Sequence, residues 1–254
     1  MSRNAYVDHN KKIVLFWSPK CACSSTVTFF CDQVLGGKAY GKKRTWLREN
    51  GYQIHISNIG EAYKLIKNGY KSIAVIRNPY SRIVSSYINK FYFYQGKGLV
   101  DYDGLEKFSK NLYNQIIENK NEYLGLSFES FIFGIEKRKK SNKYLDPHWD
   151  TQVSEEMEQD IEFDYTIRCE NYNEDIKLFC DDFNLDYPSE NKVNETSYPK
   201  EFVQNSDYLG AETSIDILSK GIVLNKNNLL NEKTIQSINC IYEIDFNKLK
   251  YDEL

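Results

Sequence analysis

The sequence predicts an α/β protein with a three-layer core, in which a central parallel sheet is flanked by helices, and with a helical C-terminal cover. Two short apolar runs, at 13–17 and 72–76, are each followed by a segment whose apolar residues recur at helical spacing. Such alternation of strands and helices implies right-handed crossovers and therefore parallel strands. The second half of the chain shows mostly helical patterns, which we expect to form the cover.

The apolar side chains of the first segments predict their secondary structure. Residues 13–17 (IVLFW) are all apolar, as in a strand that is buried on both faces. Residues 24–35 carry apolar side chains three and four positions apart, which predicts a helix with one buried face. A weaker strand is expected at 52–57 (YQIHIS), and a short helix at 61–67.

A third strand, at 72–76 (SIAVI), ends just before a long helix that begins at Pro79. The residue before a proline avoids helical backbone, and proline itself fits the first helical position. The remaining expected elements are a strand at 163–167 and helices at 104–120, 128–140, 171–183 and 232–242. We expect residues 1–254 to form a single domain, with an α/β core at 13–95 and a mostly helical part at 96–254.

The composition argues against several classes of function. With 33 Lys and Arg against 36 Asp and Glu, the formal net charge is −3, unlike that of a generally cationic nucleic-acid binder. No apolar run reaches the roughly 18 residues of a membrane span, and the first residues lack the apolar core of a secretory signal. The six cysteines show no zinc-site spacing. We therefore expect reduced thiols, no metal and a cytoplasmic location.

The segment between the first strand and the first helix has the composition of a phosphate-binding loop. Residues 18–26 read SPKCACSST, so small side chains let backbone amides approach an anion at a helix N-terminus, and Lys20 adds a positive charge. The loop is P-loop-like in its position. The GxxxxGK[ST] pattern is absent, however, which argues against an ordinary nucleotide kinase. A simple helix cap at Ser24 or Ser25 is an equally good interpretation of this loop alone.

A second polar segment follows the strand at 72–76. Arg77 stands at the end of that strand, and Ser85 lies two turns into the next helix. An arginine can hold a phosphate through two parallel hydrogen bonds, and a serine can add a hydroxyl donor. Ligands of parallel sheets bind beyond the carboxyl ends of the strands, where both polar segments are expected. Taken alone, the second segment would be interpreted as a surface Arg and a helix-facing Ser.

Together the two segments resemble those of the sulfotransferases that use 3′-phosphoadenosine 5′-phosphosulfate (PAPS). PKCACSS is similar to the 5′-phosphosulfate loop of that family, and RNPYSRIVSSYINKF to its 3′-phosphate segment, particularly in the carbohydrate sulfotransferases. DPHW at 146–149 resembles the His-Trp element of the chondroitin and related Golgi enzymes. FDY with RCEN at 163–171, and IYEIDF at 241–246, continue the resemblance in the same order. This sequence departs from the animal enzymes in showing no membrane anchor, and Asn78 replaces an acidic residue.

The resemblance implies transfer of a sulfuryl group from PAPS to a hydroxyl, most directly that of a carbohydrate, without a metal. Sulfuryl transfer is an in-line displacement that builds charge on the leaving oxygen, which Lys20 would stabilise. The core at 13–95 would bind PAPS and the part at 96–254 the acceptor. The implied donor-binding residues are Pro19, Lys20, Cys21, Ala22, Cys23, Ser24, Ser25 and Thr26 for the 5′-phosphosulfate, and Arg77 and Ser85 for the 3′-phosphate.

The acceptor hydroxyl needs a base, for which histidine is the natural candidate. The resemblance favours His55, which matches the second His of the YHGHVS stretch in the uronyl 2-O-sulfotransferases, where that residue is the base. His148 and Glu61 are alternatives for the base. His148 and Trp149 could instead contact the substrate, and His55 could be a half-buried strand residue without a chemical role.

Other functions stay open on the sequence alone. Sulfotransferases that act on peptide tyrosine, lipids or small metabolites share the donor machinery. A degenerate member of the family could bind a nucleotide or saccharide without transferring sulfate. The basic runs at 42–44 and 137–140 could hold an acidic saccharide, although such runs more often form solvated faces. We expect a hydroxyl-bearing acceptor, most directly a saccharide, and neither a nucleic-acid partner nor a membrane span.

Overall fold

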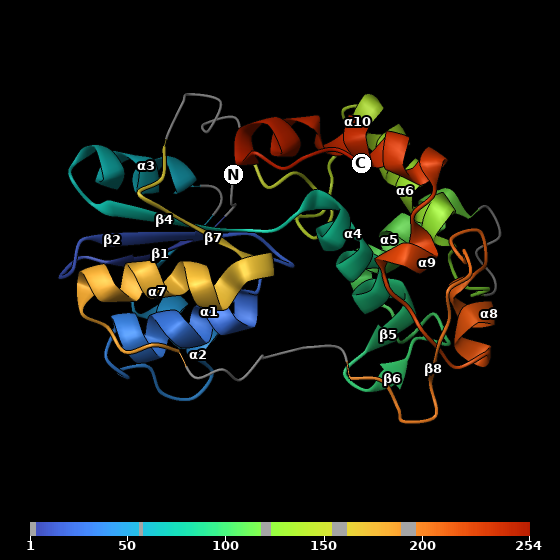
Figure 1. The fold of residues 1–254 in the computed structure, drawn as a ribbon, viewed down its shortest axis with the longest axis horizontal. Helices are drawn as coiled ribbons and strands as arrows, with labels where there is room; N and C mark the ends of the chain where they lie inside the picture. The colour runs from blue at the N-terminus through green and yellow to red at the C-terminus, as the bar shows by residue number, and fades with distance from the viewer. Residues whose placement is uncertain (1–3, 56–57, 118–122, 154–161, 189–196) are drawn as a thin grey trace. The chain divides into compact units, whose positions relative to one another are not determined.

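The computed structural model describes residues 4–55, 58–117, 123–153, 162–188 and 197–254 (Figure 1). The chain divides into two units, residues 1–78 with 151–194 and residues 79–150 with 195–254. The sequence suggested a change of character near residue 95 and gave no sign that 151–194 belongs with the first unit. This segment does so because it supplies strand β7, which pairs with β4.

The first unit contains a five-stranded sheet in the order β3-β1-β2-β4-β7. Its elements are β1 (Asn4–Asp8), β2 (Ile13–Trp17), α1 (Cys23–Phe29), η1 (Phe30–Val34), α2 (Lys43–Glu49), β3 (Gln53–His55), α3 (Ile59–Lys67), β4 (Lys71–Ile76), β7 (Tyr165–Arg168), η5 (Cys169–Asn171) and α7 (Tyr172–Phe183). Strands β2, β4 and β7 are parallel, whereas β1 runs antiparallel to both β2 and β3. The expectation of a parallel sheet is confirmed for most of the sheet and corrected at β1.

Helices cover both faces of this sheet. On one face, Leu15 belongs to the core under α1 and α7, in which the rings of Phe29 and Phe179 pack edge to face at 6.0 Å. On the other face, the ring of Phe16 lies 5.4 Å from that of Tyr63 in α3. Figure 1 shows the same arrangement, with α3 on one side of the sheet and α1 and α7 on the other. The predicted three-layer α/β architecture is therefore confirmed.

Strand β1 was not predicted because its sequence, NAYVD, is short and has polar ends. It forms a hairpin with β2 through a turn that a single side chain organises. Oδ1 of Asp8 accepts hydrogen bonds from the backbone N–H groups of Asn10 (2.8 Å) and Lys11 (3.4 Å). Lys12 then adopts a left-handed backbone with φ 52° before β2 begins. Helix α2 was also missed.

The other expected boundaries in the first unit are close to the observed ones. The helix expected at 24–35 begins one residue earlier and becomes π-helical at Phe30. The strand expected at 52–57 is β3, and positions 56 and 57 lie outside the described residues. The helices expected at 61–67 and 171–183 correspond to α3 and α7. The strands expected at 72–76 and 163–167 correspond to β4 and β7.

The second unit is mostly helical, as expected for the C-terminal cover. Its elements are α4 (Pro79–Tyr87), η3 (Ile88–Tyr92), β5 (Phe93–Tyr94), β6 (Lys97–Gly98), α5 (Lys107–Ile116), α6 (Phe128–Lys140), β8 (Val203–Gln204), α8 (Ser214–Ser219), β9 (Ile222–Val223), α9 (Lys226–Leu229) and α10 (Glu232–Leu249). Helix α6 has the expected bounds. Helix α5 is shorter than the expected 104–120, of which 118–120 lie outside the described residues.

Helix α10 extends beyond the end expected at position 242. Its backbone departs from helical geometry at Tyr242 (φ −113°) and then resumes, and Phe246 and Leu249 are buried beyond this kink.

Asp164 ties the start of β7 to β4. Its Oδ1 accepts a hydrogen bond from Lys71 Nζ (2.6 Å), and its Oδ2 accepts from the backbone N–H and the hydroxyl of Ser72, both at 2.9 Å. Burial acts to raise the pKa of Asp164, but the hydrogen bonds from Lys71 and Ser72 outweigh it, so the pKa is lowered.

We expect Asp164→Ala to reduce the free energy of unfolding by about 1–3 kcal/mol, because it removes charge-assisted hydrogen bonds. Since the folded-state pKa lies below the unfolded value, the contribution is complete above the unfolded pKa and is lost as the pH falls through the folded pKa. Urea unfolding at neutral pH and across the acid range measures both effects. Glu162→Ala, which removes an exposed carboxylate two positions away, is the control. Equal unfolding free energies for the two variants would contradict the assignment.

Candidate functional site

The loop between β2 and α1 has an unusual backbone. Lys20 and Ala22 both adopt left-handed conformations, with φ 69° and 46°. Non-glycine residues rarely do so, at a cost of order 1–3 kcal/mol each, and such residues cluster at ligand-binding and active sites. A hydrogen bond from Cys21 N–H to Ser18 O (3.1 Å) closes the turn. The conformation of this loop therefore points to a binding function.

Helix α1 starts without a side-chain cap. Its N-cap residue is Ala22, whose carbonyl accepts a hydrogen bond from Thr26 N–H (2.9 Å). The alternative that Ser24 or Ser25 simply caps the helix is therefore wrong. Backbone amides and the positive end of the helix dipole at such a start favour an anion.

A buried hydroxyl lies in the same loop. Ser18 is 2% exposed, and its Oγ has no hydrogen-bond partner among the residues that the structure describes. Buried polar groups are normally paired, so a hydroxyl of this kind is suited to a ligand oxygen.

The two thiols of the loop are hydrogen-bonded. Cys21 Sγ donates to Gln152 Oε1 and Cys23 Sγ to Ser18 O, both at 3.0 Å. Burial raises the pKa of the Cys23 thiol, and a hydrogen bond with Cys21, together with burial, raises the pKa of the Cys169 thiol. Protonated thiols are poor nucleophiles, so this arrangement does not favour covalent chemistry on cysteine. All six cysteines are described, and none of them forms a disulfide bond.

Arg77 connects β4 to the loop. Its Nη1 donates a hydrogen bond to the carbonyl of Lys20 (3.0 Å). Gln152 holds the Arg77 backbone on both sides: its Oε1 accepts from Arg77 N–H (2.9 Å) and its Nε2 donates to Arg77 O (2.8 Å). The structure thus brings Lys20 and Arg77 together at the carboxyl edge of the sheet, as their strand positions suggested.

Sequence reasoning missed two residues near this loop. Gln152, which is 1% exposed, touches both Cys21 and Arg77, yet no local pattern marks a residue that acts across such a long stretch of chain. Arg44 of α2 belongs to a basic run that was expected to form a solvated face. Its guanidinium lies 5.7 Å from the centroid of the Trp17 ring, beside the carboxyl end of β2.

His55 ends β3 at the same edge of the sheet. Asn4 in β1 is the register partner of both His55 and Trp17, so the three residues form a row across three strands. With strands about 4.8 Å apart, the backbone of His55 lies about 10 Å from that of Trp17. Trp17 is the last residue of β2, and the loop that contains Lys20 (the Lys20 loop) follows it. The His55 side chain is exposed, and so is that of Glu61 in the first turn of α3.

The remaining predicted residues belong to the second unit. Ser85 is partly exposed on α4. His148 Nδ1 lies 2.6 Å from Asp146 Oδ1, and its ring stacks on that of Phe108 at 4.7 Å. Trp149 is 2% exposed and packs within the aromatic core. Its ring is not accessible to a sugar in this structure, so the substrate-contact expectation is corrected for Trp149 and stays a prediction for His148.

Comparison with known proteins decides the family. The model of the sulfotransferase family matches residues 3–252, which is nearly the whole chain. The chain belongs to the sulfotransferase family. No curated protein and no solved structure matches it. The match confirms the resemblance that the order of the sequence motifs indicated.

The described part of this sulfotransferase shows neither a metal-binding cluster nor a membrane-spanning helix. Within the described ranges, no group of three or more His, Cys, Asp or Glu side chains is arranged to hold a metal ion. Nor does any helix in that part of the chain combine the length and the apolar composition needed to cross a membrane.

Proposed function

We propose that this protein transfers the sulfuryl group of PAPS to a hydroxyl group of a carbohydrate. The observation that carries the proposal is the contact between Arg77 and Lys20, which joins two cationic residues on a strained loop at the carboxyl edge of the sheet. Membership of the sulfotransferase family supplies the type of reaction. The choice of a carbohydrate rests on the resemblance of DPHW and IYEIDF to the carbohydrate sulfotransferases.

The residues around the loop fit a donor that carries anionic groups at two positions. Residues 19–26 would hold the phosphosulfate through backbone amides and hydroxyls, and the buried hydroxyl of Ser18 could add a further donor. Arg77 would bind the 3′-phosphate through its guanidinium. For Ser85, on α4, the resemblance implies a hydroxyl donor to the same phosphate.

The transfer itself requires charge stabilisation and removal of a proton. Bound PAPS supplies the activated sulfuryl group. The Lys20 ammonium would stabilise the negative charge that develops on the bridging oxygen as the bond to sulfur breaks. A base would take the proton from the acceptor hydroxyl as it attacks.

We propose His55 as that base, because it lies at the carboxyl edge of the sheet that also carries the Lys20 loop. His148 is the main alternative. A proton on its Nδ1 would be shared with Asp146, which would leave Nε2 to accept a proton. Glu61, which is exposed, is the third candidate.

A thermal-shift titration with 3′-phosphoadenosine 5′-phosphate, against ADP and ATP, tests the donor site. At a hundredfold over its Kd, the bisphosphate should stabilise the fold by about 2.7 kcal/mol. We expect Arg77→Ala to abolish the preference for the 3′-phosphate. Arg48→Ala, which removes an exposed arginine of the same unit, should retain it. Equal shifts with all three nucleotides would contradict a 3′-phosphate site, and a selective shift without sulfate transfer would indicate a binding protein that has lost catalysis.

A further inference from the structure

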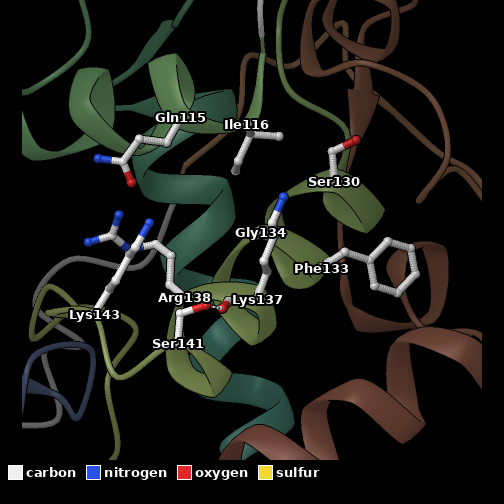
Figure 2. A pocket seen from close by; sticks show the side chains of 9 residues that line it. All are labelled: Gln115, Ile116, Ser130, Phe133, Gly134, Lys137, Arg138, Ser141 and Lys143. Carbon is white, nitrogen blue, oxygen red and sulfur yellow. Dashed lines mark hydrogen bonds between the residues drawn. The ribbon is translucent and has the colours of Figure 1, made fainter.

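A pocket of about 440 Å³ lies among α5, α6 and the segment that follows α6 (Figure 2). All of its lining residues belong to the second unit. Gly134 allows the two helices to approach closely, because a Cβ at that position would lie 2.4 Å from Cδ1 of Ile116. The volume is within the range of pockets that bind small organic ligands, about 300–1,000 Å³.

The lining of this pocket is positively charged. Lys137, Arg138 and Lys143 contribute three cations, and no carboxylate is present among the described lining residues. Within the described residues, neither Lys137 nor Lys143 forms an ion pair, although the net charge of the chain is −3. Four other lysines of this unit do pair with carboxylates, namely Lys90, Lys110, Lys140 and Lys220.

The head groups of Arg138 and Lys143 and the ring of Phe133 occupy different parts of the pocket wall (Figure 2). Figure 2 shows the head groups of Arg138 and Lys143 on the same side as the Gln115 amide, with the ring of Phe133 on the other side. Phe133 is 37% exposed, and Ile116 adds apolar surface between the helices. Cationic donors beside an accessible aromatic ring suit a ligand with anionic groups and an apolar face.

The position of the basic residues has a partial explanation in helix energetics. The C-terminal turn of a helix favours cations, which accounts for basic residues at 137–140 in α6. Lys140 has a further ordinary role, because it is exposed and forms an i, i+4 ion pair with Glu136 at 2.6 Å. The dipole does not account for Lys143, which lies beyond the helix, or for the pocket that Lys137 and Lys143 share.

We propose that this pocket binds an anionic saccharide, with sulfate or carboxylate groups held by Lys137, Arg138 and Lys143 and a sugar ring against Phe133. Because all the described lining residues belong to one unit, we expect binding to need neither PAPS nor the Lys20 loop. The pocket would give the protein a hold on an acidic glycan in addition to the donor-binding residues. The choice of a saccharide over other polyanions rests on the proposed carbohydrate acceptor, whereas the binding of an anion does not.

Titration calorimetry of the full chain without PAPS tests this site, with a chondroitin sulfate tetrasaccharide as the probe. We expect binding that weakens as salt is added. The double variant Lys137→Gln/Lys143→Gln should weaken it at least about tenfold, through loss of charge-assisted hydrogen bonds. Lys140→Gln is the matched control on the same helix, because Lys140 is paired and does not line the pocket, and it should change affinity by less than about twofold.

Further ligands separate the possible sources of binding. Maltotetraose carries no charge and should not bind, while unsulfated chondroitin tetrasaccharide should bind more weakly than the sulfated form. Equal losses in Lys140→Gln and in the double variant would overturn the pocket in favour of diffuse charge. Equal binding of hexaglutamate would overturn the choice of a saccharide. The double variant should keep parental affinity for 3′-phosphoadenosine 5′-phosphate, so failure here is distinguishable from failure of the donor site.

Discussion

Replacement of Lys20 by alanine is expected to reduce turnover by about 10²–10³-fold, the loss typical when one preorganised group that stabilises transition-state charge is removed. Lys20 lies in the strained loop after β2, and its carbonyl is bound by Arg77. That backbone contact does not depend on the Lys20 side chain, so the loop should keep its shape in the variant. The loss should therefore appear mainly in kcat rather than in nucleotide affinity.

The measurement is sulfate transfer from labelled PAPS under saturating donor, with the thermal shift by 3′-phosphoadenosine 5′-phosphate recorded in parallel. Lys12→Ala is a matched control. Like Lys20, Lys12 is a lysine with a left-handed backbone, at φ 52°, but it is exposed, precedes β2 and so lies at the opposite end of that strand. Both variants lose one positive charge from the same kind of backbone. Parental turnover in Lys20→Ala would show that the proposed mechanism is wrong.

The second large effect is expected for His55→Ala, which should reduce turnover by about 10²–10⁴-fold, the usual contribution of a general base. Its affinity for 3′-phosphoadenosine 5′-phosphate should stay near the parental value, because His55 lies two strands from the strand that leads into the Lys20 loop. A merely structural histidine would instead lower stability and affinity together. Steady-state kinetics and the thermal-shift titration, run on the same preparation, separate these outcomes.

His148→Ala and Asp146→Asn provide the comparison for the base. Asp146 orients the His148 ring through a 2.6 Å contact, and the ring also stacks on Phe108. If His148 is the base, its replacement abolishes turnover, and Asp146→Asn reduces turnover without preventing folding. A loss confined to these two variants, with His55→Ala fully active, would move the role from His55 to His148.

Local patterns in the sequence were sufficient to predict those strands and helices whose own side chains show a clear apolar pattern. The all-apolar β2, the strand β4 and the helix α6 were predicted at or within one residue of their observed bounds. Elements shaped by few residues were predicted less well. Strand β1 depends on a turn that Asp8 organises, which leaves no periodic signal, and α10 continues through a kink at Tyr242 beyond its expected end.

The sequence by itself determined the α/β class, the family and the polar segments that carry Lys20 and Arg77, because these depend on neighbouring residues in the chain. Only the tertiary structure showed that Arg77 binds the Lys20 carbonyl and that Gln152 holds both segments. It also placed Trp149 inside a core, where the sequence suggested a substrate contact. These features depend on contacts between residues far apart in the chain, which the hydrophobic period of a single segment does not encode.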